Sequence, residues 1–388
     1  MAKLLIAHGG APTAVINASL CGAIREARRI DPACQVFGAA HGSAGILTQQ
    51  FIDLSALDDA ALDRLSRSPA SAIGTSRTPL EEGDYARMAQ ILAQNGFTHV
   101  LFTGGNGSMD TCGRLGAACA DSGILVGGIP KTIDNDIAVI DHAPGYGSAA
   151  RFAAKTMLEI SQDVASLPIH VCIVEYMGRN TGWITAASAL ARGERCDAPH
   201  ILLLPEVPFD EERFLDEVSR VWARGCGVLV AASEGICRAD GTPVAPPVFT
   251  SGRATYFGDA SAYLTKLVIE RLGIKARSEK PGILGRCDAL AVSEIDRDEA
   301  IRTGALAART ILGGRGGMMA ALRRMDGEPY RCEETLIPVG EVMLTERLLP
   351  PEFISESGFD VTDAFLRWAR PLIGGPLGEF TGLLTVQE

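Results

Sequence analysis

One short segment in the first half of the chain carries several reactive side chains. Lys131, Thr132, Asp134 and Asp136 follow directly on the apolar run 124–129. Two carboxylates beside a lysine can serve as a general base, a metal ligand and a phosphate clamp. A solvated loop rarely follows a buried strand with that many functional groups. We therefore interpret the segment PKTIDNDI as part of a catalytic site.

Three other segments are rich in glycine and also follow apolar runs. They are HGGAPTAVIN, FTGGNGSMDT and YMGRNTGW, centred on residues 9–12, 104–108 and 177–179. Paired glycines let a backbone approach a phosphate, and a helix N-terminus adds free N–H groups. Arg179 can fork onto a phosphate or carboxylate. A plain tight turn remains the alternative for the glycine pairs, because none matches a dinucleotide or Walker A motif.

These segments need a scaffold, and the order of apolar runs predicts one. We expect strands over 3–7, 35–40, 98–103, 124–129, 170–176, 200–204 and 228–232. Helices are expected over 13–29, 108–120, 147–164, 181–191 and 209–223. This alternation predicts an α/β protein with Rossmann-like parallel sheets covered by helices. Ligands bind beyond the carboxyl ends of such strands, so the four segments are expected to form one active site.

Composition restricts the functional classes. The chain has 388 residues, 47% of them hydrophobic, which is typical of a globular protein with two or three domains. Its net charge of −11 and lack of a long basic run argue against a nucleic-acid partner. The ten cysteines show no zinc spacing and indicate reduced thiols. The apolar start is too short for a signal peptide or membrane span, so we expect a cytoplasmic enzyme with no membrane partner.

Taken together, these segments resemble the phosphofructokinase family. GG-A-P, GG-N-G-S, P-K-T-I-D-N-D and M-G-R occur in the family's order and spacing, and the resemblance covers residues 3 to 310. It implies phosphoryl transfer from ATP or pyrophosphate to the 1-hydroxyl of fructose 6-phosphate, with Mg²⁺, as in glycolysis. It also implies a homodimer or homotetramer. The expected two-domain fold has a donor domain over 1–142 and about 254–310, and a sugar-phosphate domain over 143–253 and about 311–388.

The resemblance also implies a role for each matching residue. Asp134 would be the general base, and Lys131, Thr132 and Arg179 would complete the catalytic set. The donor would be bound by residues of the first two glycine-rich segments and by an arginine of the segment GTSRTP, which together are Gly10, Arg77, Gly105, Asn106, Gly107 and Ser108. The sugar phosphate would be bound by a second group, which is Met177, Gly178, Glu234, Arg277, Arg286 and His170.

Three positions depart from the family's pattern. Asn106 stands where an aspartate normally helps hold magnesium, so the predicted metal ligands are Asn106 and Asp136, with Asp110 as a substitute. His170 stands where an arginine from a neighbouring subunit usually meets the sugar phosphate. Ile283 replaces a polar residue of the same clamp. A different sugar phosphate therefore stays open as the acceptor, and a non-catalytic sugar-phosphate or nucleotide-binding regulator is the remaining alternative.

The phosphoryl donor is open on physical grounds. Pyrophosphate users in the family typically pair an aspartate at the position of Gly107 with a lysine at the position of Lys131. The aspartate repels the α-phosphate of ATP. Gly107 leaves room for ATP, whereas Lys131 favours pyrophosphate. Because exclusion by a charge is the harder constraint, the sequence slightly favours ATP.

Overall fold

The chain forms two compact units. The computed structural model describes residues 2–193, 196–251, 254–343, 345–378 and 380. Unit 1 comprises Met1–Ser148 and Arg286–Arg347, and unit 2 comprises Ala149–Gly285 and Leu348–Glu388. Within the described ranges, no helix combines the length and the apolar character needed to cross a membrane.

Unit 1 is built on a seven-stranded sheet. In spatial order its strands are β13 (Cys332–Pro338), β12 (Met318–Arg324), β5 (Leu125–Pro130), β4 (His99–Gly104), β1 (Lys3–His8), β2 (Gln35–Ala39) and β3 (Phe51–Asp53). The strands from β12 to β2 run parallel, and β13 and β3 add antiparallel edges. Residues 4–7 of β1 are fully buried, as expected for a central strand covered on both faces.

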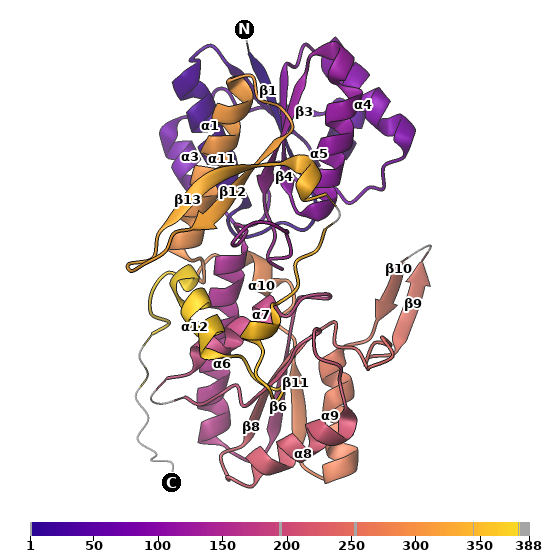
Figure 1. Cartoon of the computed structure of the whole chain (residues 1–388), viewed down its shortest axis with the longest axis vertical. Coiled ribbons are helices and arrows are strands. Elements are labelled where there is room, and N and C mark those ends of the chain that lie inside the picture. The colour runs from indigo at the N-terminus through magenta and orange to yellow at the C-terminus, as the bar shows by residue number, and fades with distance from the viewer. Residues whose placement is uncertain (1, 194–195, 252–253, 344, 379, 381–388) are drawn as a thin grey trace. The chain divides into compact units, whose positions relative to one another are not determined.

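Helices cover both faces of this sheet (Figure 1). The helices of one face are α1 (Ile16–Ile30), α3 (Asp59–Ser66) and α11 (Glu294–Leu312), whose apolar side chains share a core with β1 and β2. The other face is covered by α4 (Glu82–Gln94) and α5 (Asn106–Ala118). The short helix α2 (Ser43–Leu47) follows β2.

Unit 2 contains a smaller, fully parallel sheet. Its strands in spatial order are β11 (Ala276–Glu279), β6 (Val171–Tyr176), β8 (Val228–Ser233) and β7 (Ile201–Leu203). On one face, α8 (Glu211–Trp222) and α9 (Ala260–Leu272) pack against apolar side chains of the sheet. The Tyr176 hydroxyl donates to the Ala153 carbonyl at 3.0 Å and ties β6 to α6 (Tyr146–Ser166).

The remaining elements of unit 2 are shorter. They are α7 (Trp183–Ala187), α12 (Asp363–Ala369) and the antiparallel hairpin of β9 (Pro247–Ser251) and β10 (Ala254–Phe257). Trp183 is fully buried and packs against Trp368 with the rings tilted, the ring centroids lying 4.9 Å apart.

The predicted α/β class with parallel sheets is confirmed, and each predicted strand and helix has a counterpart. The second segment of unit 1 begins and ends at other residues than predicted: it spans Arg286–Arg347, where about 254–310 was expected. Residues 254–285 belong to unit 2, because β11 pairs with β6. Residues 311–347 belong to unit 1, because β12 pairs with β5 and extends its sheet. The ten cysteines are all free thiols, and six of them are buried.

Candidate active site at the carboxyl edge of the first sheet

Three loops meet at the carboxyl edge of the unit 1 sheet because their strands are neighbours. The strand order β5-β4-β1 places the loops that follow these strands side by side. The Gly9 amide donates to the Thr103 carbonyl at 2.9 Å, and the Lys131 amide donates to the Gly104 carbonyl at 3.1 Å. The predicted convergence of these three segments is thus present within unit 1.

Glycine is required where these loops touch. A Cβ on Gly104 would lie 2.0 Å from the Ser108 Oγ, and one on Gly9 would lie 2.3 Å from the same atom. Gly10 has a φ of +72°, a conformation that side chains disfavour. The close approach of the first loop to α5 therefore depends on the glycines that the sequence singled out.

A pocket of about 620 Å³ lies at this edge, formed by residues of unit 1. All residues predicted on the donor side line it, namely Gly10, Arg77, Gly105, Asn106, Gly107, Ser108, Lys131, Thr132, Asp134 and Asp136. The pocket thus combines glycine-rich backbone with cationic and carboxylate side chains. That set can bind a polyphosphate and can also accept a proton.

Lys131 is a buried cation in the pocket wall. Its side chain is 3% exposed, and its Nζ donates to the Ala11 carbonyl at 2.6 Å. Burial lowers the pKa of Lys131 to about 8, and the nearby Arg77 and Arg286 act in the same direction, while Asp134 opposes them. The ammonium is therefore present at neutral pH and is lost as the pH rises through about 8.

Asp134 is held by the residues around it. Its backbone amide donates to the Thr132 Oγ1 at 3.1 Å, and the Thr132 amide donates to the Pro144 carbonyl at 3.2 Å. Asp134 is half-buried and lines the pocket, so its carboxylate lies where a bound ligand can be reached.

The two predicted metal ligands lie in contact. The Asn106 Nδ2 donates to the Asp136 carbonyl at 3.1 Å and to the Asp136 Oδ2 at 3.2 Å. Asn106 Oδ1 and Asp136 Oδ1 are buried, and neither has a hydrogen-bond partner in the described part of the chain. Burial raises the pKa of Asp136. Two unsatisfied oxygens of a hard-ligand type beside a phosphate pocket fit a magnesium ion.

Several pocket residues escaped the sequence reasoning. Arg114 forms an ion pair with Asp110, its Nε lying 3.4 Å from Oδ2, and its guanidinium stacks over Tyr85. The i,i+4 spacing of Asp110 and Arg114 on the predicted helix was a usable signal for this pair. Glu346 also lines the pocket, but it lies beyond the residues that carry the family resemblance.

Unit 2 brings together part of the predicted acceptor set. Gly178 follows β6 with a φ of +123°, and a Cβ there would lie 2.5 Å from the Thr181 carbonyl oxygen. The Glu234 amide donates to the Tyr176 carbonyl at 3.0 Å. A Cβ on Gly235 would lie 1.6 Å from the Arg179 carbonyl oxygen. Met177, Gly178, Arg179 and Glu234 therefore share the carboxyl edge of the unit 2 sheet.

The other predicted acceptor residues lie elsewhere. His170 precedes β6 and Arg277 lies early in β11, both at the amino end of the unit 2 sheet. His170 is 2% exposed, and burial and then Arg277 lower its pKa. Because its ring is buried, this placement does not support a His170 that reaches into a second subunit. Arg286 belongs to unit 1, in the short helix α10 (Leu284–Cys287) that spans the unit boundary.

The fold and the pocket define a class. Parallel strands lead into glycine loops, and a lysine and two aspartates line the space beyond them. This is the arrangement of an α/β enzyme that acts on phosphorylated ligands.

Comparison with known proteins narrows the class to a family. The sequence matches the phosphofructokinase family over residues 3–311. It is 35% identical over 384 residues to the pyrophosphate–fructose 6-phosphate 1-phosphotransferase of Rhodospirillum rubrum, covering 96% of this chain and 94% of that protein. It is 30% identical over 379 residues to the sulfofructose kinase of Alkalicoccus urumqiensis, covering 96% of each chain.

A solved structure gives the same result. The pyrophosphate-dependent phosphofructokinase of Nitrosospira multiformis matches with a TM-score of 0.89 at 30% identity, covering 98% of this chain and 94% of that chain. The chain belongs to the phosphofructokinase family, which the motifs in the sequence had predicted.

Proposed function

We propose that the chain transfers a phosphoryl group from pyrophosphate to the 1-hydroxyl of fructose 6-phosphate. The observation that carries this proposal is the pocket of unit 1, where Lys131, Asp134 and Asp136 line the same space as the glycine loops. Phosphoryl transfer needs mostly positioning and charge stabilisation, and these groups supply both.

Each pocket residue then has a defined task. Asp134 takes the proton from the acceptor hydroxyl as that oxygen attacks phosphorus. Lys131 attracts the donor phosphates, and Thr132 stabilises the charge that develops on the transferred group. Asn106 and Asp136 would hold Mg²⁺ through their unsatisfied oxygens. When bound, Mg²⁺ neutralises charge on the donor phosphates.

We propose pyrophosphate as the phosphoryl donor, although Gly107 had led the sequence analysis to favour ATP. The relatives named for pyrophosphate use match nearly the whole chain. The buried ammonium of Lys131 offers a compact cation to the donor, as expected of a pyrophosphate user. A Cβ at Gly107 would meet no atom within 4 Å, so this space is open and by itself excludes neither donor.

Sulfofructose is a second candidate acceptor. The sulfofructose kinase relative spans the chain as fully as the pyrophosphate-dependent ones. His170 and Ile283 replace two polar positions of the acceptor clamp that the family resemblance implies. We also propose that the protein forms a homodimer or homotetramer and is located in the cytoplasm.

A matrix of donors and acceptors tests the function. Purified protein with Mg²⁺ is assayed with pyrophosphate or ATP against fructose 6-phosphate or sulfofructose. The highest kcat/KM is expected for pyrophosphate with fructose 6-phosphate. Turnover with ATP but not with pyrophosphate would contradict the proposed donor. Turnover with sulfofructose but not with fructose 6-phosphate would contradict the proposed acceptor. Binding without turnover in every pair would favour the regulator alternative.

Gly107→Asp tests the donor site directly. The new carboxylate enters open space, so the fold should tolerate it. A like charge beside a donor phosphate costs several kcal/mol, so any turnover with ATP should fall by about 10²-fold while turnover with pyrophosphate persists. Gly107→Ala is the control for the loss of glycine itself. Equal losses with both donors would show that residue 107 does not face the α-phosphate.

Asn106→Asp tests the magnesium site. It places a carboxylate where an amide now contacts Asp136, so the two negative charges repel until a cation joins them. We expect a lower melting temperature without Mg²⁺, a larger rise on adding Mg²⁺, and a half-saturating Mg²⁺ concentration about tenfold lower, the equivalent of about 1.4 kcal/mol. Thermal shift and rate are both titrated with Mg²⁺. An unchanged Mg²⁺ dependence in both would exclude Asn106 as a ligand.

A further inference from the structure

The segment that carries the proposed catalytic residues forms a closed loop. We call residues 131–145 the return loop, because its end comes back to its start. The Thr132 amide donates to the Pro144 carbonyl at 3.2 Å, and Thr132 and Gly145 form an isolated β-bridge. Lys131, Thr132, Asp134 and Asp136 on its first half line the donor pocket. Whatever holds the second half in place therefore also sets the position of the first.

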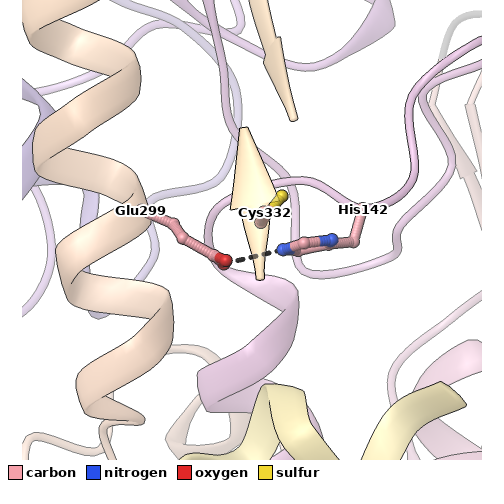
Figure 2. Close-up of side chains that lie close together, drawn as sticks. All are labelled: His142, Glu299 and Cys332. Atoms are coloured by element: carbon pink, nitrogen blue, oxygen red, sulfur yellow. Dashed lines mark hydrogen bonds and ion pairs between the residues drawn. The ribbon is translucent and has the colours of Figure 1, made fainter. Parts of the chain in front are cut away.

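His142 attaches the second half of the return loop to α11 (Figure 2). Its ring is 1% exposed, with Nδ1 2.7 Å from the Asp141 Oδ2 and Nε2 2.7 Å from the Glu299 Oε2. Burial alone would lower the pKa of His142, but Glu299 and Asp141 outweigh it and raise the pKa to about 9. The ring is therefore a cation that donates from both nitrogens at neutral pH.

The carboxylates that pair with His142 also contact other side chains. Glu299 is 1% exposed and accepts from the Tyr330 hydroxyl at 2.7 Å. The charged or titratable groups around the bridge are Asp141 and Tyr146 in and after the return loop, Glu299 and Arg302 on α11, Arg324 on β12, Tyr330 and Cys332 at β13, and Arg347. A neutral side chain at 142 would remove the hydrogen-bonded cation from the buried Glu299 Oε2 and leave only Arg302, which lies 3.8 Å from Oε1.

A second contact lies one turn earlier on α11. Asp296 is 2% exposed and accepts from the Gly145 amide at 2.8 Å and from the Ser148 amide at 2.9 Å. Asp296 and Glu299 are three residues apart and so lie on one face of α11. The end of the return loop is thus docked on α11 through a backbone contact and through the His142 side chain.

A metal centre is the competing interpretation of this cluster. Ligand atoms of His142, Glu299 and Cys332 lie within 4.8 Å of one another. Both ring nitrogens already face carboxylates at hydrogen-bond distance. Burial raises the pKa of Cys332 to about 12, so its thiol keeps its proton at neutral pH. The geometry favours an ion-paired imidazolium over a metal ligand.

We propose that His142 is a positioning residue for phosphoryl transfer: its bridge between Asp141 and Glu299 holds the return loop in the form that catalysis needs. The catalytic part of this inference rests on the proposed function, and the ordering of the loop does not. The physical reason is the closed path of the loop. A misplacement of a reacting group by about 1 Å can cost roughly 10²-fold in rate.

The test combines His142→Phe with the double variant His142→Phe/Glu299→Leu. Phenylalanine keeps a ring in the space but donates no hydrogen bond. The double variant also removes the buried carboxylate that the single change would leave without its imidazolium, so it guards against a simple failure to fold. Cys332→Ser is the matched control, because it alters the third member of the cluster without touching the bridge.

Two readouts are taken from each variant. In amide hydrogen exchange, a peptide covering 132–146 should exchange faster in both His142 variants, while a peptide from α1 should not change. In steady-state kinetics, kcat should fall by about 10²-fold while the acceptor KM stays near that of the wild type. Cys332→Ser should behave like the wild type in both.

Each outcome decides between the interpretations. Unchanged loop exchange, or faster exchange with an unchanged kcat, would overturn the positioning role. If Cys332→Ser lost as much kcat as the His142 variants, the cluster would have to be interpreted as a metal centre and not as an ion pair. If the wild type transfers no phosphoryl group, the proposed function fails and the catalytic part of this inference with it. The exchange data then still decide whether His142 orders the loop.

Discussion

Replacing Asp134 with asparagine is expected to lower kcat by about 10²–10⁴-fold, the usual contribution of a general base. Asparagine keeps the size and shape of the side chain, and the backbone contact to Thr132 remains. It cannot take a proton from the acceptor hydroxyl. Acceptor KM should therefore change little, because the lost interaction acts only in the transition state.

Asp110→Asn is the matched control for Asp134→Asn. Asp110 lines the same pocket but is paired with Arg114, so its neutralisation should have a far smaller effect on kcat. The measurement is steady-state kinetics with pyrophosphate and fructose 6-phosphate for both variants. A near wild-type kcat in Asp134→Asn, or equal losses in both variants, would remove Asp134 from the role of base.

Replacing Lys131 with methionine is expected to lower kcat/KM for pyrophosphate by about 10²–10³-fold, the usual cost of removing a preorganised electrostatic group. Methionine retains the apolar length of a side chain that is 3% exposed. The ammonium and its bond to the Ala11 carbonyl are lost. Lys3→Met is a matched control, because the Lys3 Nζ also donates to a backbone carbonyl, that of Asn95, at 2.9 Å.

The pH profile gives Lys131 a distinct signature. Burial lowers the pKa of its ammonium to about 8, so the cation is present below that pH and lost above it. The kcat/KM for pyrophosphate should therefore fall as the pH rises through about 8, and this limb should vanish in Lys131→Met. If the limb persisted in the variant, another group would be the one that titrates.

The donor loops were predictable because their signals are local. Each apolar run ends at a strand end, and the glycines, Lys131 and Asp134 follow within a few residues. In a parallel sheet, neighbouring strands bring such loops to one edge whatever the details of packing. The strand positions and the residues that line the unit 1 pocket could thus be predicted from one sequence and a family resemblance.

The later part of the chain was harder to assign. β12 joins the unit 1 sheet beside β5, and β13 then pairs with β12 in antiparallel orientation. Such pairing depends on distant partners and leaves little trace in a local pattern. For this reason the second domain boundary was misplaced, and Glu346 was missed as a pocket residue.

The sequence by itself determined the α/β class, the family, and which short segments line the pocket of unit 1, because residue type and local spacing encode these. Only the tertiary structure decided that the Asn106 amide meets Asp136 and that His170 is buried away from Gly178. It also joined His142 to Glu299, 157 residues further along the chain. A buried imidazolium is stable only where carboxylates pair with it. Asp141 is adjacent in the sequence, but only folding brings Glu299 to the ring.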